Sequence, residues 1–275
     1  MRIIITGVDG FIGGALHEHL SKNHEVIPFD RESFTKLIYT DSIEPTEADA
    51  VIHCAAITSL DECEKDPKDT FLVNVYGTYK IAKYSIKSKV KAGILLSSGA
   101  VYRPGNKLTE RSPIKPSNIY GLTKLLSEDI VLKGDTPFTV LRLFFPYGKG
   151  SPEKQLMRRL VNKVHHSEPI TIQGNDGPLM NPLYIDDLLR AIDLVLMSPK
   201  KGAFNLGGSE HLTLNDIISI IGATLGKVPK VKNCDGRPEN MNCDSTLFNK
   251  TYDFKPATSL SQGIRELARA LNSNE

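Results

Sequence analysis

The sequence is poor in cysteine, lacks any long apolar run and carries almost no net charge. Its four cysteines, Cys54, Cys63, Cys234 and Cys243, form no C-x-x-C pair in 275 residues, which argues against a disulfide framework. Without a stretch of about 18 apolar residues, no membrane span is expected. Lys plus Arg number 34 and Asp plus Glu 32, so the net charge of +2 provides no basic surface for nucleic acid or an anionic membrane.

Metal ligands and targeting signals are also missing from the pattern. His165 and His166 are adjacent, but no further ligands stand at a recognised spacing, so the pair is interpreted as a solvated helix end and no metal is expected. The chain goes directly into a strand pattern at Met1–Ile5, without a charged n-region, apolar h-region and cleavage site. Together with the scarcity of cysteine, this predicts a cytoplasmic protein.

Short apolar runs alternate with helical patterns over the first half of the chain. Strands are predicted at 2–5, 25–29, 50–55, 92–96 and 138–142, and helices at 11–20, 71–88 and 120–131. This alternation is typical of a parallel sheet covered by helices on both faces. The strands are continuously apolar, as strands buried on both faces should be. We therefore predict an α/β fold with a Rossmann-type, doubly wound parallel sheet.

The alternation weakens beyond Gly148. Helices are predicted at 151–166, 186–197, 213–225 and 260–271, and short strands at 170–172 and 203–206. Thr213 followed by Asp216 is the pattern of a capped helix start. We predict a dinucleotide-binding domain formed by 1–147 plus about 182–207, and a smaller C-terminal α/β substrate lobe formed by about 148–181 plus 208–275.

Three glycines, Gly7, Gly10 and Gly13, lie between the first strand and the first helix. Glycines there allow a tight turn and let backbone N–H groups approach a pyrophosphate at the positive end of the helix. The spacing is G-x-x-G-x-x-G rather than G-x-G-x-x-G, so its position after the first strand gives the motif its weight. Asp30 ends the second strand 17 residues after Gly13, where a carboxylate can bind ribose hydroxyls and repel a 2′-phosphate. NAD is therefore favoured over NADP, although the neighbouring Arg31 is a potential phosphate ligand.

Tyr120 and Lys124 form a Y-x-x-x-K pair on one helix face. An ammonium near a phenol favours the phenolate, so we expect a lowered Tyr120 pKa and proton exchange with a sugar hydroxyl. Ser98 follows the fourth strand, at the carboxyl edge where open parallel sheets bind ligands, and its hydroxyl can hold the same substrate oxygen. The pair alone recurs by chance on protein surfaces; in combination with Ser98 and the glycine turn it is specific.

With these motifs the chain resembles the extended short-chain dehydrogenases/reductases of the NAD-dependent epimerase/dehydratase family, which act on nucleotide sugars. The resemblance covers nearly the whole length. Its matching segments are T-G-V-D-G-F-I-G at 6–13, H-C-A-A at 53–56, N-V-Y-G-T at 74–78, S-S-G-A-V-Y at 97–102, Y-G-L-T-K at 120–124, L-R with Y-G at 141–148, Y-I-D-D at 184–187, F-N-L-G at 204–207, G-R-P at 236–238 and T-S-L at 258–260.

The resemblance implies roles for individual residues. Those implied to bind NAD are Gly7, Gly10, Phe11, Ile12, Gly13, Asp30, Ala55, Ala56, Asn74, Tyr120 and Lys124, with Asp41 as a weak further match near adenine. Those implied to act in catalysis are Ser98, Tyr120 and Lys124, and those implied to touch the substrate are Ser98, Tyr120 and Arg237. The resemblance also implies a homodimer built on a four-helix bundle, from the helix around 69–88 and the one starting near Tyr120.

Three departures from the family pattern concern the substrate. Phe145 stands where the family often has asparagine, and Met180 where it often has arginine. The 4,6-dehydratases usually carry Asp-Glu where this chain has Gly99-Ala100, so the acid and base for removing water are missing and dehydration is disfavoured.

The favoured function is an NAD-dependent nucleotide-sugar epimerase, acting at C4 through a transient keto sugar with Tyr120 as acid and base. One alternative is an NAD(P)H-dependent 4-ketoreductase, because the segment 55–64 resembles that of the dTDP-4-dehydrorhamnose reductases. Another is a non-catalytic, dinucleotide-binding redox sensor. The presence of Tyr120, Lys124 and Ser98 together disfavours the sensor, since such relatives usually lose the tyrosine or the lysine.

Overall fold

The computed structural model describes residues 1–40 and 43–272, so the adenine contact expected of Asp41 lies outside the described residues. The chain divides into two compact units. The first comprises Met1–Arg103, Ser112–Arg142 and Ala191–Phe204, and the second comprises Pro104–Arg111, Leu143–Arg190 and Asn205–Glu275. The predicted assignment of the cofactor to one domain and the substrate to the other is a statement about function and stays a prediction. No helix in the described part of the chain is long and apolar enough to cross a membrane.

A six-stranded sheet in the order β11-β6-β4-β3-β1-β2 forms the centre of the first unit. Its strands are β1 (Arg2–Thr6), β2 (Glu25–Phe29), β3 (Ala50–His53), β4 (Ala92–Ser98), β6 (Phe138–Leu143) and β11 (Gly202–Leu206). The pairs β1–β2, β1–β3 and β3–β4 run parallel. Because β2 and β3 lie on opposite sides of β1, the strand order reverses there, and ligands of such sheets bind at this reversal.

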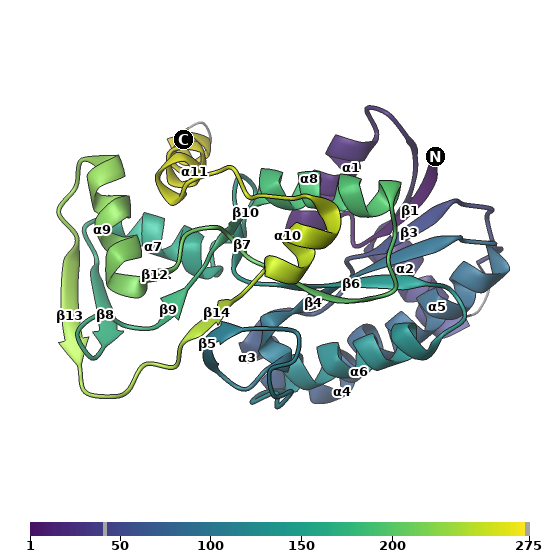
Figure 1. Cartoon of the computed structure of the whole chain (residues 1–275), viewed down its shortest axis with the longest axis horizontal. Coiled ribbons are helices and arrows are strands. Elements are labelled where there is room, and N and C mark those ends of the chain that lie inside the picture. Colours follow the sequence, from purple (N-terminus) through teal and green to yellow (C-terminus); the bar gives the residue numbers. More distant parts are fainter. Residues whose placement is uncertain (41–42, 273–275) are drawn as a thin grey trace. The chain divides into compact units, whose positions relative to one another are not determined.

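Helices cover both faces of this sheet, which confirms the predicted doubly wound α/β fold. The helices are α1 (Phe11–Leu20), α2 (Arg31–Thr40), α3 (Leu60–Lys65), α4 (Pro67–Phe71), α5 (Gly77–Lys87) and α6 (Ile119–Lys133). Two short turns accompany them, the π-helical turn η1 (Leu72–Tyr76) and the 3₁₀ turn η2 (Gly99–Val101). Figure 1 shows α4, α5 and α6 along one face and α1 on the other, beside the end of α8 (Ile185–Met197). His19 of α1 hydrogen-bonds Asp193 of α8 at 2.7 Å.

The core of the first unit forms where strand and helix side chains interdigitate. Val51, Leu95 and Val140 of the sheet pack with Ile81 of α5 and Val131 of α6 in one apolar cluster, and all five are buried. Burying such side chains contributes about 1.5–3 kcal/mol each. The residues that end these strands and begin these helices are thereby held on a rigid base.

The long helix predicted over 71–88 is interrupted. The structure has the π-helical turn η1 between α4 and α5, with the buried Asn74 inside it. The Asn74 side chain bonds a neighbouring loop, and Thr78 Oγ1 donates to the Asn74 carbonyl at 2.6 Å. A π-turn widens the helix by one residue and frees backbone groups for such contacts. The spacing of apolar residues in the sequence does not reveal this π-helical turn.

Other boundaries also differ from the prediction. The helix expected at 151–166 begins only at Leu156, because Ser151 folds back on Gly148 through hydrogen bonds in both directions. Helices α2 and α3 were not predicted. The first shows apolar residues at helical spacing in Phe34, Leu37 and Ile38, all buried. The second is too short for a period to appear.

The second unit combines small sheets with helices. Its strands are β5 (Gly105–Leu108), β7 (Pro146–Tyr147), β8 (Pro169–Gln173), β9 (Leu179–Met180), β10 (Leu183–Tyr184), β12 (Leu212–Thr213), β13 (Lys230–Cys234) and β14 (Met241–Cys243). Its further helices are α7 (Leu156–His165), α9 (Leu214–Leu225), α10 (Thr246–Tyr252) and α11 (Leu260–Asn272). The sheet β12-β9-β14-β5 mixes parallel and antiparallel pairs. The predicted Thr213–Asp216 cap is confirmed as a reciprocal capping box.

Candidate active site

The glycine turn joins β1 to α1 at the point where the strand order reverses. Gly7 has φ of +71°, and a Cβ there would lie 2.8 Å from the Ala55 backbone. A Cβ at Gly13 would lie 2.0 Å from the Gly7 carbonyl oxygen. Gly10 caps α1 without a side-chain hydrogen bond. The first turn of α1, with Phe11 and Ile12, thus offers backbone N–H groups and a positive helix end to a phosphate, so the turn fits a dinucleotide pyrophosphate.

Asp30 stands directly after β2, as predicted, and also begins α2. Its Oδ1 accepts the Ser33 N–H at 2.8 Å, and its carbonyl accepts the Phe34 N–H. Hydrogen bonds from the Ser33 backbone and side chain lower the Asp30 pKa. The carboxylate is therefore ionised at neutral pH, which suits ribose hydroxyls and opposes a 2′-phosphate.

A buried histidine supports the loop that follows β3. Thr78 donates to the Asn74 carbonyl, so its oxygen accepts from His53 Nε2, 3.0 Å away. His53 Nδ1 is then the acceptor for the Thr6 hydroxyl at 2.7 Å. Thr6 Oγ1 in turn accepts the backbone N–H groups of Cys54 and Ala55 at 3.1 Å. The chain of bonds fixes one neutral tautomer of His53 and holds the ends of β1 and β3 together.

Asn74 connects the same loop to α6. Its Oδ1 accepts the Ile57 N–H at 2.8 Å, and its Nδ2 donates to the Ile57 carbonyl and to Thr123 Oγ1 at 3.0 Å each. The amide is thus satisfied by the protein itself. The structure gives Asn74 a positioning role between the Ala55–Ile57 loop and the helix that carries Tyr120, while a direct contact with the cofactor stays a prediction.

Tyr120, Lys124 and Ser98 come together, on the first turns of α6 and at the end of β4. Asn118 caps α6 by accepting the Gly121 N–H at 2.8 Å. A Cβ at Gly121 would lie 2.3 Å from the Ala100 carbonyl oxygen, so glycine is what allows α6 to approach η2 this closely. As a result the Tyr120 hydroxyl reaches a hydrogen bond with Ser98. Ser98 Oγ also accepts the Ala100 N–H at 3.1 Å.

The expected lowering of the Tyr120 pKa is wrong for the protein alone. Burial raises the pKa to about 12, and the hydrogen bond with Ser98 offsets only part of this. Lys124 lies over the phenol ring, with Nζ 5.9 Å from its centroid, and donates to the Leu96 carbonyl at 2.9 Å. The ammonium therefore faces the ring and a backbone oxygen rather than the phenol oxygen, and Tyr120 remains protonated.

Lys124 is itself perturbed. It is only 5% exposed, and burial lowers its pKa to about 8. Cys54, Glu128 and Cys63 raise the pKa and partly oppose burial. The Lys124 side chain is thus still mainly an ammonium at pH 7, but its pKa lies only about one unit above that pH.

The remaining substrate candidates lie in the second unit. Arg237 is exposed after β13 and makes no hydrogen bond or ion pair within residues 1–40 and 43–272. Phe145 has φ of +46°, a conformation that asparagine adopts readily and phenylalanine rarely. Met180 is 2% exposed on β9, so no charge replaces the arginine that the resembled family often has there.

Several polar residues of the site were not singled out from the sequence. Arg142 interrupts the buried run of β6, and Glu128 lies four residues after Lys124 on α6; both are buried. A charge inside an apolar run signals a buried partner and was the available clue for Arg142. Thr6 and Thr78 carried no comparable signal, because threonine is common in strands and helices alike.

The chain is similar to a known protein family, to several named proteins and to solved structures. A family profile described as NAD dependent epimerase/dehydratase family matches residues 3–207. An uncharacterised UDP-glucose epimerase of Bacillus subtilis is 26% identical, with 99% of this chain and 98% of that protein covered. A UDP-glucose 4-epimerase of Lactobacillus helveticus is 25% identical, over 93% and 92%. The crystal structure of UDP-glucuronic acid 4-epimerase from Bacillus cereus, in complex with UDP-glucuronic acid and NAD, aligns over 100% of both chains with a TM-score of 0.88 and 24% identity.

The buried His53 makes stability depend on pH. Burial, with a smaller contribution from the Lys124 charge, lowers its pKa from 6.5 to about 3. The unfolded chain therefore binds a proton that the folded protein excludes, and stability is lost as pH falls below 6.5 toward 3. Between pH 6.5 and 4 this costs about 3 kcal/mol. In urea unfolding, His53→Gln should lose this part of the acid dependence, whereas the exposed His166→Gln should keep it. Parallel pH profiles for His53→Gln and the unaltered protein would contradict the assignment.

Proposed function

The chain belongs to the NAD dependent epimerase/dehydratase family, and we propose that it is a nucleotide-sugar epimerase that inverts C4 of a hexose. The observation that carries the proposal is the meeting of Tyr120, Ser98 and Lys124 at the carboxyl end of the sheet. Asn74 ties their helix to the loop beside the glycine turn, so the catalytic groups and the cofactor turn share one framework. The named relatives include UDP-glucose and UDP-glucuronic acid 4-epimerases, which favours a UDP-hexose or UDP-hexuronate as substrate.

Tyr120 acts as the base and then as the acid. Its oxygen takes the proton of the sugar hydroxyl and later returns it to the alkoxide. The Ser98 hydroxyl, already directed at Tyr120, donates to the developing carbonyl oxygen. The Lys124 ammonium over the ring stabilises the Tyr120 phenolate that must be present before the sugar proton is taken and that is restored when the proton is returned. NAD supplies the acceptor and the donor of the hydride. Since burial keeps Tyr120 protonated in the protein alone, the positive charge of the oxidised nicotinamide would add to that of Lys124.

The remaining binding roles follow from the charges. The first turn of α1, with Gly7, Gly10 and Gly13, holds the pyrophosphate, and Asp30 holds the adenosine ribose. Arg237, exposed and without an ion pair in the described residues, holds the diphosphate of the substrate. Dehydration is disfavoured because η2 has Gly99 and Ala100 where a carboxylate pair would be needed.

A pair of exposed tyrosines marks the expected dimer surface. Tyr76 and Tyr79 stack with ring centroids 5.9 Å apart and are each 42% exposed. They border a hollow lined by apolar residues of α4, η1, α5 and α6. An apolar patch of this kind, on the helices that resembled proteins use for a four-helix bundle, favours a homodimer. All four cysteines are free, which agrees with the proposed cytoplasmic location.

The purified protein should interconvert UDP-glucose and UDP-galactose, or the corresponding glucuronates, without net formation of NADH. NAD should be released in up to one equivalent per chain when the protein is denatured, because an epimerase regenerates its cofactor in each cycle. Nuclear magnetic resonance of the sugars and chromatography of the released nucleotide measure both. An empty site with stoichiometric NAD(P)H consumption on a keto sugar would instead identify the 4-ketoreductase.

Tyr120→Phe should reduce kcat by about 10²–10⁴, or roughly 3–5 kcal/mol in the barrier, because the proton acceptor is removed while the ring remains. Tyr39→Phe, at an exposed position of α2, is the matched control and should retain full activity. Turnover of the Tyr120→Phe variant within a factor of three of the original would exclude Tyr120 as the base.

Light scattering should give the mass of two chains, and Tyr79→Glu should give the mass of one, because a carboxylate cannot be buried unpaired in an apolar interface. Tyr39→Glu changes the charge equally on another exposed surface and should leave the dimer intact. A monomeric unaltered protein would contradict the proposed assembly.

A further inference from the structure

Three consecutive residues of β4 each contact α6. The Leu96 carbonyl accepts from Lys124 Nζ at 2.9 Å, the Ser97 hydroxyl donates to Glu128 Oε1 at 2.5 Å, and Ser98 hydrogen-bonds Tyr120. Their partners on α6 are positions 120, 124 and 128, which follow one another by four residues and therefore lie on one helix face. The first two belong to the proposed catalytic group. Glu128 is the third and has no role so far.

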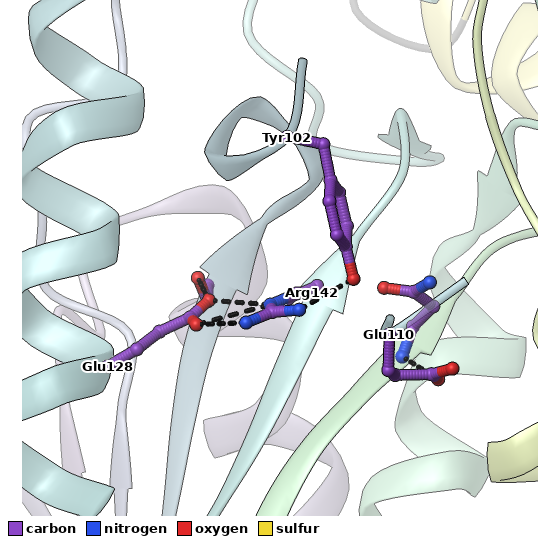
Figure 2. A network of polar contacts seen from close by, with 6 residues as sticks. Tyr102, Glu110, Glu128 and Arg142 are labelled. Carbon is purple, nitrogen blue, oxygen red and sulfur yellow. Dashed lines mark hydrogen bonds and ion pairs between the residues drawn. The ribbon is translucent and has the colours of Figure 1, made fainter. Parts of the chain in front are cut away.

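The Glu128 carboxylate is 2% exposed and is held by Arg142 of β6, which is 6% exposed (Figure 2). Arg142 Nε lies 3.0 and 3.2 Å from the two carboxylate oxygens, and Nη2 lies 2.6 Å from Oε2. The remaining end of the guanidinium is fixed as well, since Nη1 donates to the Tyr102 hydroxyl at 2.6 Å. This fork geometry is specific to arginine and leaves Glu128 a single position.

A buried ion pair of this kind is poorly explained by stability alone. Two charges lose their hydration on burial, and well-packed apolar residues often serve stability equally well. The Glu128–Arg142 pair lies one helical turn beyond Lys124, where the buried Glu128 carboxylate acts on that ammonium.

The groups that face Lys124 from other elements are neutral at pH 7. Burial raises the pKa of Cys54, after β3, to about 12 and also raises that of Cys63 on α3. His53 on β3 is neutral because its pKa is about 3, and Tyr120 is protonated. Among the described residues that shift the Lys124 pKa, Glu128 is therefore the one that carries a charge at pH 7. Arg142 of β6 pairs with this carboxylate.

We propose that Glu128 is a positioning residue, held by Arg142 and Ser97, that fixes α6 on β4 and keeps Lys124 in its ammonium form. The catalytic meaning rests on the proposed function, in which the Lys124 ammonium supports the Tyr120 phenolate. The electrostatic part does not, because it concerns this chain alone.

The test is the titration of Lys124 in the protein without cofactor or substrate. Protein labelled with ¹³C at lysine Cε shows the loss of the ammonium proton directly, and Lys124→Arg assigns the signal. Glu128→Gln should lower the midpoint by about one pH unit, because the loss of a nearby opposite charge disfavours the ammonium. Asp129→Asn removes a neighbouring carboxylate that is exposed and pairs with Lys133, and should leave the midpoint unchanged.

Activity gives the second measurement. Because the Lys124 midpoint should move from about 8 to about 7, Glu128→Gln should lower kcat about twofold at pH 7 and about fivefold at pH 8, with the dependence of kcat on pH displaced with the Lys124 titration, and should change KM little. A purely structural residue would lower the melting temperature without displacing the pH profile.

If Glu128→Gln does not fold because Arg142 is left buried and unpaired, the double variant Glu128→Gln/Arg142→Met removes both charges, and the midpoint should still fall, by about half a unit. A folded variant whose Lys124 midpoint stays within about 0.2 units of the original would overturn the proposal. A displaced midpoint in a protein that acts on no nucleotide sugar would refute the proposed function and leave the role of Glu128 standing.

Discussion

The close packing of α6 against the end of β4 is the constraint on which the site depends. Gly121 permits it, because any Cβ there would collide with the Ala100 carbonyl. The Leu96 carbonyl then holds the Lys124 ammonium, and Ser98 meets Tyr120. The same packing buries the phenol and the amine, which moves both pKa values in the direction of the neutral form. The ionised forms of Tyr120 and Lys124 therefore depend on nearby charges, and Glu128 is one of these charges.

The glycine turn, where the cofactor is proposed to bind, is likewise held by hydrogen bonds from neighbouring elements. Thr6 ends β1 and His53 ends β3, and their hydrogen bond holds the glycine turn beside the Ala55 loop. Asn74 continues the connection from that loop to Thr123 on α6. The glycine turn and the helix that carries Tyr120 are therefore connected through hydrogen bonds of the Thr6 and Asn74 side chains to the loop between them. Preorganisation of this kind is what positions a hydroxyl and a hydride acceptor on one sugar carbon.

Sequence patterns predicted the elements that repeat a period and the motifs that stand at strand ends. The parallel strands, α1, α6 and the Thr213 cap are examples, and so is the meeting of Ser98, Tyr120 and Lys124. The π-turn at Asn74 was missed because one inserted residue leaves the apolar pattern intact. The direction of the Tyr120 pKa was wrong because burial outweighs a charge that lies over the ring, and neither burial nor orientation is visible in Y-x-x-x-K. Arg142 and Glu128 are 14 residues apart in the sequence and lie on different elements, and only the fold brings them together.

In the proposed epimerase reaction, a hydrogen leaves a sugar carbon and returns to the same carbon within one active site. This return is tested most directly by following UDP-glucose that carries deuterium at C4 through complete equilibration in ordinary water. The C4-inverted product should keep the deuterium at C4, with a primary isotope effect on turnover. Loss of the deuterium to the solvent, or its appearance at another carbon, would contradict it.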